Sequence, residues 1–159
     1  MADIYYPPVS FYFEVKVLGT PRSPWVETGI DASFQEVSGL DRELELQPLA
    51  EGGENRFMHQ LPKRGKHPNL VLKRGLVAQK SSLADWAEKT VGSDFSVPVQ
   101  PRTLVVTLLG AERALVVWTF TNAFPVKWTT SSFNATEGKI AVETLEMAYA
   151  FVERQIKAT

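Results

Sequence analysis

Residues 103–123, TLVVTLLGAERALVVWTFTNA, read as two β-strands joined by a short turn. Thr103–Leu109 is apolar on both faces, which is typical of a central strand. Leu115–Ala123 alternates between two side-chain faces with the period of a strand, and Gly110–Arg113 fits a hairpin connection between the two runs. This stretch sets the fold class, because a hairpin joins antiparallel strands.

Strand patterns continue on both sides of this hairpin. Further alternating runs lie at residues 10–18, 32–38, 42–47, 69–74 and 139–153. We expect the runs at 32–38 and 42–47, which Gly39 separates, to form a strand pair. The side-chain parity of 139–153 flips near Glu143, which predicts one long strand with a bulge, although a helix face also fits this run.

One helix stands out at residues 82–91, SLADWAEKTV. Ser82 is the expected N-cap, Asp85 follows three residues later, and Gly92 can end the helix. The apolar residues that share one helix face are Leu83, Trp86, Ala87 and Val91. Several strands with one short helix predict a mostly β fold, an antiparallel β-sandwich or barrel with the helix on its flank.

The composition fits one domain spanning residues 1–159. Of its 159 residues 44% are hydrophobic, so the chain can bury a core without a covalent staple. It has no cysteine, which excludes disulfide scaffolds and thiolate metal sites. Its 17 basic and 18 acidic residues give a net charge of −1, which argues against a protein built to hold nucleic acid.

No targeting or membrane segment is visible in the sequence. The first residues, MADIYYPPVSFYFEVKV, include an acid and two prolines where a secretory signal has a basic end and an apolar run. The longest apolar stretches, 104–110 and 114–118, are far shorter than the ~20 residues of a membrane-spanning helix. We therefore expect synthesis in the cytoplasm and no membrane anchor.

Charge is distributed in two opposite blocks. Glu27–Glu54 holds eight acids and one base, whereas Asn55–Lys80 holds seven bases and no acid, so the blocks carry −7 and +7. Either the blocks steer one copy of the chain against the next, or they pair across strands of one molecule, where each pair adds only ~0.2–1 kcal/mol. Part of each block lies on Pro48–Pro68, a long excursion with little alternation and no pattern for packing into its own core. This segment favours self-association.

The residues that usually carry chemistry form no recognisable site. His59 and His67 are the only histidines, and no cysteine is available to complete a zinc set. Neither histidine belongs to a triad signature, and Gly52–Glu54 lacks the lysine and hydroxyl of a phosphate loop, so it reads as a backbone bend. The sequence therefore predicts no catalytic residue, no cofactor and no metal ligand, and we expect a protein that is not an enzyme.

Several short motifs occur in the order and spacing of a known family. They are FQEVSGL at Phe34–Leu40, EGG at Glu51–Gly53, LKRG at Leu72–Gly75, DW at Asp85–Trp86, NAFPVKW at Asn122–Trp128 and the closing strand Ile140–Phe151. They span nearly the whole chain. Together they resemble the tail tube proteins of contractile phages, above all the inner tube subunits of phage-tail-like contractile injection systems.

This resemblance implies a structural subunit with a flanking helix and a long arm, here Gln47–Pro68, that packs on neighbouring subunits. It implies six-membered rings that stack into a tube around a cargo-conducting lumen. The implied partners are a surrounding sheath protein, baseplate or initiator and terminator proteins, and the cargo. Assembly would take place in the bacterial cytoplasm, before the tube becomes part of a phage tail or a released extracellular particle.

The expected interface residues lie on the arm and on the strand that follows it. Five form the arm bend: Glu51, Gly52, Gly53, Asn55 and Arg56. Four are bases for acidic neighbours: Lys63, Arg64, Lys73 and Arg74.

Other functions stay open on the sequence alone. The chain could be the ring that initiates the tube on the baseplate, or a ring protein like those of type VI secretion, which share the architecture. From a different class, a β-barrel whose aromatic side chains line a cavity for a small apolar ligand fits the same strands.

Overall fold

The computed structural model describes residues 11–19, 30–53, 56–76, 81–94, 96–111, 113–132 and 140–157. The strands and the helix, in chain order, are β1 (Tyr12–Leu18), β2 (Ile30–Phe34), β3 (Glu36–Ser38), β4 (Glu43–Leu49), β5 (His59–Lys66), β6 (Leu70–Gly75), α1 (Ser82–Val91), β7 (Arg102–Leu109), β8 (Ala114–Thr130), β9 (Val142–Ala148) and β10 (Phe151–Ile156).

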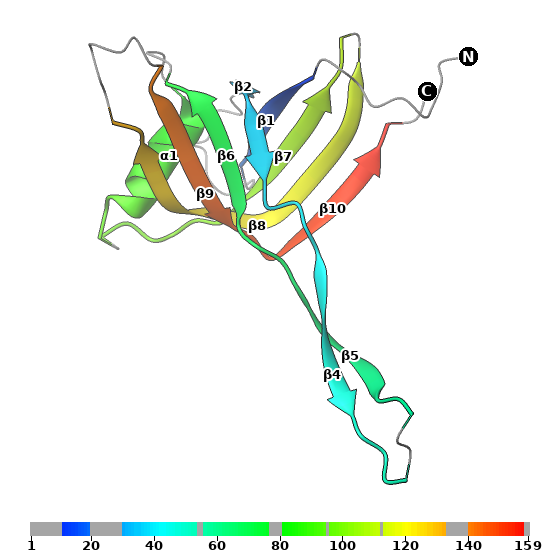
Figure 1. Ribbon diagram of the computed structural model, residues 1–159. Coiled ribbons are helices and arrows are strands. Elements are labelled where there is room, and N and C mark those ends of the chain that lie inside the picture. Colours follow the sequence, from blue (N-terminus) through cyan, green and yellow to red (C-terminus); the bar gives the residue numbers. More distant parts are fainter. Residues whose placement is uncertain are drawn as a thin grey trace.

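The body of the molecule is an antiparallel sheet that folds over on itself. Its strand order is β2-β1-β7-β8-β9-β6-β3, and β10 pairs with β8 off this path. The first part of β8 pairs with β7 and β10, and its last part pairs with β9, so β8 bends from one layer into the other (Figure 1). The result is sandwich-like, as predicted, but it is not a closed barrel, because β2 and β3 remain end strands of the path.

Both layers contribute to one apolar core. Alternate residues of β1, Phe13, Val15 and Val17, point inward, as expected for a half-buried strand. β7 is central, between β1 and β8, which confirms the interpretation of residues 103–109. The largest fully buried side chains come from β2, β6, α1, β7, β8 and β9 as well: Phe34, Leu70, Leu72, Leu83, Leu104, Phe120, Leu145 and Met147.

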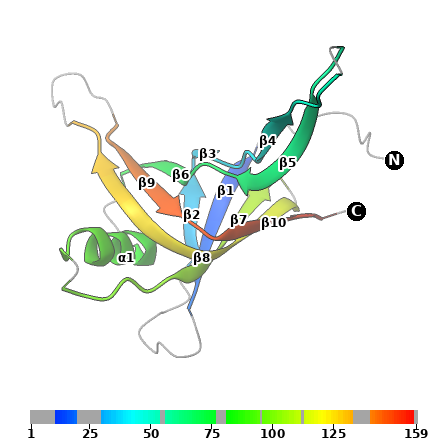
Figure 2. The same cartoon turned by 90° about the horizontal axis from the view of Figure 1, so that it is seen from below.

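The predicted helix is confirmed, and α1 packs against β8 on the flank of the body (Figure 2). Its N-cap is Ser81, whose hydroxyl accepts a hydrogen bond from the backbone N–H of Ala84 at 3.1 Å, so the prediction of Ser82 was wrong by one residue. Gly92 ends the helix as expected. The buried side chains of its apolar face are Leu83, Trp86 and Ala87, whereas Val91 stays 40% exposed.

The predicted pairing of residues 32–38 with 42–47 is wrong. β2 pairs with β1, β3 pairs with β6, and β4 pairs with β5. The physical reason lies at Gly39, whose φ of +84° is accessible to glycine. There the chain leaves the body and begins a separate two-stranded ribbon instead of turning back on β3.

Residues 142–148 and 151–153 are strand and not helix, but they belong to two strands, β9 and β10, separated at Tyr149 and Ala150, and not to one long strand as predicted. β9 and β10 follow β8 in one continuous register, with Ala148 opposite Phe124 and Phe151 opposite Thr121. The register shift lies on β8, between Pro125 and Lys127, and not near Glu143 as expected. Glu143 itself points into the body and is buried.

Candidate subunit interface

The most exposed regular structure is the ribbon of β4 and β5, which projects away from the body (Figure 1). Every residue of both strands is exposed. The predicted arm, Gln47–Pro68, is therefore observed as an arm, but its paired structure begins four residues earlier, where Glu43 lies opposite Lys66. β5 was missed from the sequence because Pro62 and Gly65 interrupt its alternation, which a strand outside a larger sheet tolerates.

Both faces of the arm carry apolar side chains. Residues opposite each other in a strand pair share a face. Leu44 and Leu46 lie opposite Gly65 and Pro62 on one face, whereas Leu49 and Leu61 lie on the other face, together with Glu43 and Lys66. The large apolar side chains of the arm, which are 44–56% exposed, are Leu44, Leu46, Leu49, Phe57, Met58 and Leu61. Clustered exposure of this kind marks a surface that a partner covers.

The structure places most of the predicted interface residues on this arm. Glu51, Gly52 and Gly53 form the exposed turn at its tip, where Gly53 has a φ of +98°. Arg56, Lys63 and Arg64 are exposed on the returning segment. Asn55 lies outside the described residues. Among the described side chains, no carboxylate lies within ion-pair distance of Lys63 or Arg64.

Lys73 and Arg74 lie on the body, in β6, and differ from the arm bases. Lys73 reaches Glu36 on β3 at 2.8 Å in an exposed ion pair. Arg74 is only 4% exposed, and its Nε donates to Glu143 Oε2 at 2.6 Å. The prediction that Arg74 presents its charge to an acidic neighbour is therefore corrected, because that charge is satisfied inside the subunit.

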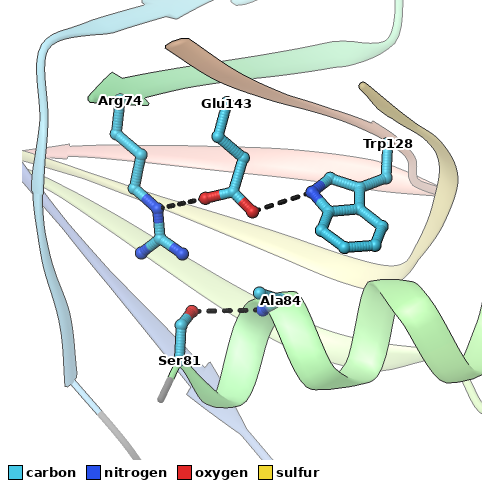
Figure 3. A network of polar contacts seen from close by, with 5 residues as sticks. All are labelled: Arg74, Ser81, Ala84, Trp128 and Glu143. Carbon is cyan, nitrogen blue, oxygen red and sulfur yellow. Dashed lines mark hydrogen bonds and ion pairs between the residues drawn. The ribbon is translucent and has the colours of Figure 1, made fainter. Parts of the chain in front are cut away.

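Glu143 joins three elements in a buried network that sequence reasoning missed. Its second oxygen, Oε1, accepts a hydrogen bond from Trp128 Nε1 at 2.7 Å (Figure 3). The guanidinium of Arg74 also lies 5.1 Å from the centre of the Phe34 ring. The carboxylate on β9 thus links β6 and β8 to its own strand. Sequence reasoning missed it because strand alternation predicts apolar side chains, and not acids, at inward-facing positions.

The two charge blocks partly neutralise each other within the chain. Glu43 faces Lys66 across the ribbon, and Glu36 pairs with Lys73 across β3 and β6. The reading in which opposite charges pair within one molecule is therefore confirmed for the Lys73–Glu36 ion pair, and among the described residues Lys63 and Arg64 belong to no such pair.

The arm joins the body through a neck, residues 39–42 and 67–69. The ring of His67 stacks on that of Tyr149, with centroids 4.1 Å apart and planes 12° apart. Tyr149 Oη donates to Gly39 O at 3.4 Å, and Arg42 donates to the carbonyl of Val152. Burial raises the pKa of Tyr149, the positive charge of Arg42 opposes the shift, and Asp41 adds to it.

The body also presents unpaired strand edges. β2 and β3 end the sheet path, and β10 pairs only with β8 among the described strands. On β10, Phe151 is 50% exposed and Ile156 is 67% exposed. Free backbone edges of this kind pair readily with another chain.

Other kinds of site find little support in the described part of the chain. The described residues contain no group of three or more histidines and acids placed to hold a metal ion. None of their helices has the length and apolar character required to cross a membrane. A groove of about 320 Å³ beside the neck is lined by Asp41, Glu43, Lys66, His67 and Pro68, and so lacks the aromatic lining of the ligand-barrel alternative.

Comparisons with known proteins agree with this architecture. A chain in the cryo-EM structure of the anti-feeding prophage baseplate is 30% identical, with a TM-score of 0.80 over 94% of this chain and 96% of that one. A chain in the sheath-tube complex of the extracellular contractile injection system PVC is 27% identical, with a TM-score of 0.71 over 96% and 94%. An Hcp protein, 13% identical with a TM-score of 0.59 over 93% and 92%, shares the fold.

A family model gives the assignment. None of the curated protein sequences compared matches the chain. The model of the T4-like virus tail tube protein gp19, however, matches residues 9–153, which include both layers, the arm and the helix. The chain therefore belongs to the T4-like virus tail tube protein family.

Proposed function

We propose that six copies of this chain close into a ring, and that such rings stack into the inner tube of a contractile phage tail or phage-tail-like injection system. The likeness to chains of a six-fold symmetrised baseplate and of a sheath-tube complex supports this arrangement. Within a closed ring the free strand edges of each body meet those of its neighbours, which limits uncontrolled pairing. Stacking of rings is heterologous, so it continues as a filament until a partner stops it.

The single observation that carries the proposal is the arm. Its residues are exposed on both strands, and its apolar side chains have no core of their own. Leaving this surface in water costs about 25 cal/mol for each Å² that a neighbour could cover. We infer that the arm packs on an adjacent subunit, with Glu51–Gly53, Asn55 and Arg56 at its bend and Lys63 and Arg64 against acidic side chains. Lys73, on β6 of the body, is exposed beside Glu36 and is the fourth base that we assign to acidic neighbours.

The remaining partners follow from the tube. A sheath protein surrounds it, a baseplate or initiator starts it, a terminator ends it, and cargo passes through the lumen. The tube assembles in the bacterial cytoplasm and leaves it in the finished particle, and the subunit acts as structural material without enzymatic activity. The whole chain, residues 1–159, works as one tube domain.

A second role within the same particle is a single specialised ring. Chains in the anti-feeding prophage cap and in the PVC sheath/tube terminator are 25% and 26% identical to this chain. Copy number in purified particles separates the roles, because a repeating tube protein outnumbers the baseplate by many rings, whereas a specialised ring does not.

Charge reversal on the arm tests the proposal. The double variant Lys63→Glu and Arg64→Glu should fold with an unchanged melting temperature but form no tubes in negative-stain micrographs. A matched control reverses Lys89 and Arg113, two exposed bases remote from the arm, and should leave tube growth intact. Unchanged tubes in the arm variant would remove the electrostatic role of the arm. A wild-type chain that stays single in light scattering at every concentration would remove the tube itself.

A further inference from the structure

The arm contacts the body through the neck, residues 39–42 and 67–69. There the two segments entering and leaving the arm contact each other and the same part of the body. At Gly39, an added Cβ would lie 1.9 Å from the backbone oxygen of Asn69. The two neck segments therefore touch without any intervening side chain.

Both neck segments are tied to residues 146–152, where β9 passes into β10. On the outgoing side, Arg42 donates to Val152 O, and Gly39 O accepts from the hydroxyl of Tyr149. On the returning side, Asn69 Nδ2 donates to Glu146 Oε1 at 2.8 Å. Each segment thus has its own attachment to one short stretch of the body.

Tyr149 links these attachments to the core. One face of its ring stacks on His67 of the returning segment, and an edge-to-face contact, 4.9 Å between centroids, joins it to the fully buried Phe120. The Tyr149 residue is 7% exposed, so it is part of the body and not of the arm. Aromatic contacts of this geometry add stability beyond the area they bury.

From this arrangement we propose that Tyr149 and His67 act as positioning residues, which preorganise the arm in the lone subunit for docking on a neighbour. The inference rests on the proposed role of the arm. Its physical benefit is that a rigid arm loses little conformational freedom when it docks, so less of the contact energy is spent on ordering. Among the described strands β4 and β5 pair only with each other, so the described contacts that can set the direction of the arm lie in the neck.

The test measures arm direction in single molecules, apart from assembly. Since the chain has no cysteine, two can be introduced for fluorophores, at Gln60 on the arm and Glu88 on α1, both exposed. At concentrations too low for self-association, energy transfer in the otherwise wild-type chain should give one narrow population. His67→Ala should broaden or shift this population. Tyr149→Ala should do the same at temperatures where the variant is still folded, although its melting temperature should also fall because Tyr149 belongs to the core.

Two further variants keep the proposal falsifiable. His59→Ala removes the only other histidine, on the arm itself, and should leave the population narrow. Tyr149→Phe keeps the ring contacts and removes only the long, 3.4 Å hydrogen bond to Gly39 O, so its population should stay much closer to the wild type than that of Tyr149→Ala. A broad wild-type population, an unaffected His67→Ala population, or a Tyr149→Phe variant as broad as Tyr149→Ala would each overturn the proposal. A narrow population in a chain that never forms tubes would instead count against the proposed function and leave the positioning role intact.

Discussion

Glu143 offers the sharpest test of how burial affects an ion pair. Two neighbouring residues of β6, Lys73 and Arg74, face opposite sides of the sheet, and each forms an ion pair of similar length. Arg74 and Glu143 are 2.6 Å apart with side chains 5% and 4% exposed. Lys73 and Glu36 are 2.8 Å apart with side chains 40% and 56% exposed. The nitrogen–oxygen distance is thus nearly the same in the two ion pairs, whereas the exposed fraction of their side chains differs.

Glu143→Ala should lower the free energy of unfolding by about 3–5 kcal/mol, since it leaves a buried guanidinium without its counter-charge. It also removes the acceptor of Trp128 Nε1, and the about 1–3 kcal/mol cost of an unsatisfied donor overlaps with this loss. For a chain of this length each kcal/mol shifts the melting temperature by about 2–4 °C, so a fall of at least about 6 °C is expected. Glu36→Ala, at the exposed pair, should change stability by only about 0–1 kcal/mol.

The assay is urea unfolding of the single-chain form, followed by tryptophan fluorescence and circular dichroism so that two-state behaviour can be verified. The double variant Arg74→Met and Glu143→Leu should recover most of the loss, because it removes both charges at once. A Glu143→Ala variant no weaker than Glu36→Ala would refute the reasoning. A double variant as unstable as Glu143→Ala would refute it as well, because the lost free energy of unfolding would then come from altered side-chain packing and not from an unpaired charge.

Three further outcomes follow from the backbone, the helix cap and the neck. Gly39→Ala should lower the free energy of unfolding by more than the about 1–2 kcal/mol that a left-handed backbone costs, because the new Cβ would lie 1.9 Å from a carbonyl oxygen. At Gly53 nothing lies within 4 Å of an added Cβ, so thermal unfolding of Gly53→Ala should show only the backbone cost. Ser81→Ala should cost about 1 kcal/mol in the same assay, and Ser82→Ala should cost clearly less, because only the first removes the cap. Burial raises the pKa of Tyr149 above its ordinary 10.0, so the folded state holds the phenolic proton more tightly than the unfolded state does. Its contribution to stability should be complete below pH 10.0 and decline as the pH rises through the raised pKa, and urea titrations of Tyr149→Phe should show a smaller alkaline decline.

The sequence predicted those elements whose side chains follow one period. The strand at 10–18 and the helix at 82–91 were found because burial on a sheet or helix face repeats every two or 3.6 residues. The pairing of strands was harder to predict. Alternation in 32–38 and 42–47 indicates that these residues form strands, but it does not indicate which other strand each one pairs with. Gly39 decides that, and its left-handed backbone has no signature beyond the glycine itself.

The candidate site shows the same division. Charge counting found the arm bases, because exposed charges on a segment without a hydrophobic pattern have few other roles. It also assigned Arg74 to the surface, since sequence alone treats every arginine near another base as part of one patch. What separates Arg74 from Lys73 is the parity of β6, in which odd and even residues face opposite sides, together with an inward-facing acid on β9. Only the pairing of β6 with β9 brings that acid within reach.

The chemistry of the arm explains why charge reversal is a better probe than neutralisation. Before assembly, the ribbon exposes Leu44, Leu46 and Leu61, and an exposed apolar strand pair is an aggregation hazard. Lys63 and Arg64 interrupt that surface with positive charge, which opposes aggregation of the lone subunit, and in the proposed assembly they also face acids on a neighbour. Neutral side chains would remove both effects together, and a precipitate could not be assigned to either. Glutamates keep the ribbon charged while inverting its sign, so a loss of tubes from soluble protein isolates complementarity between copies.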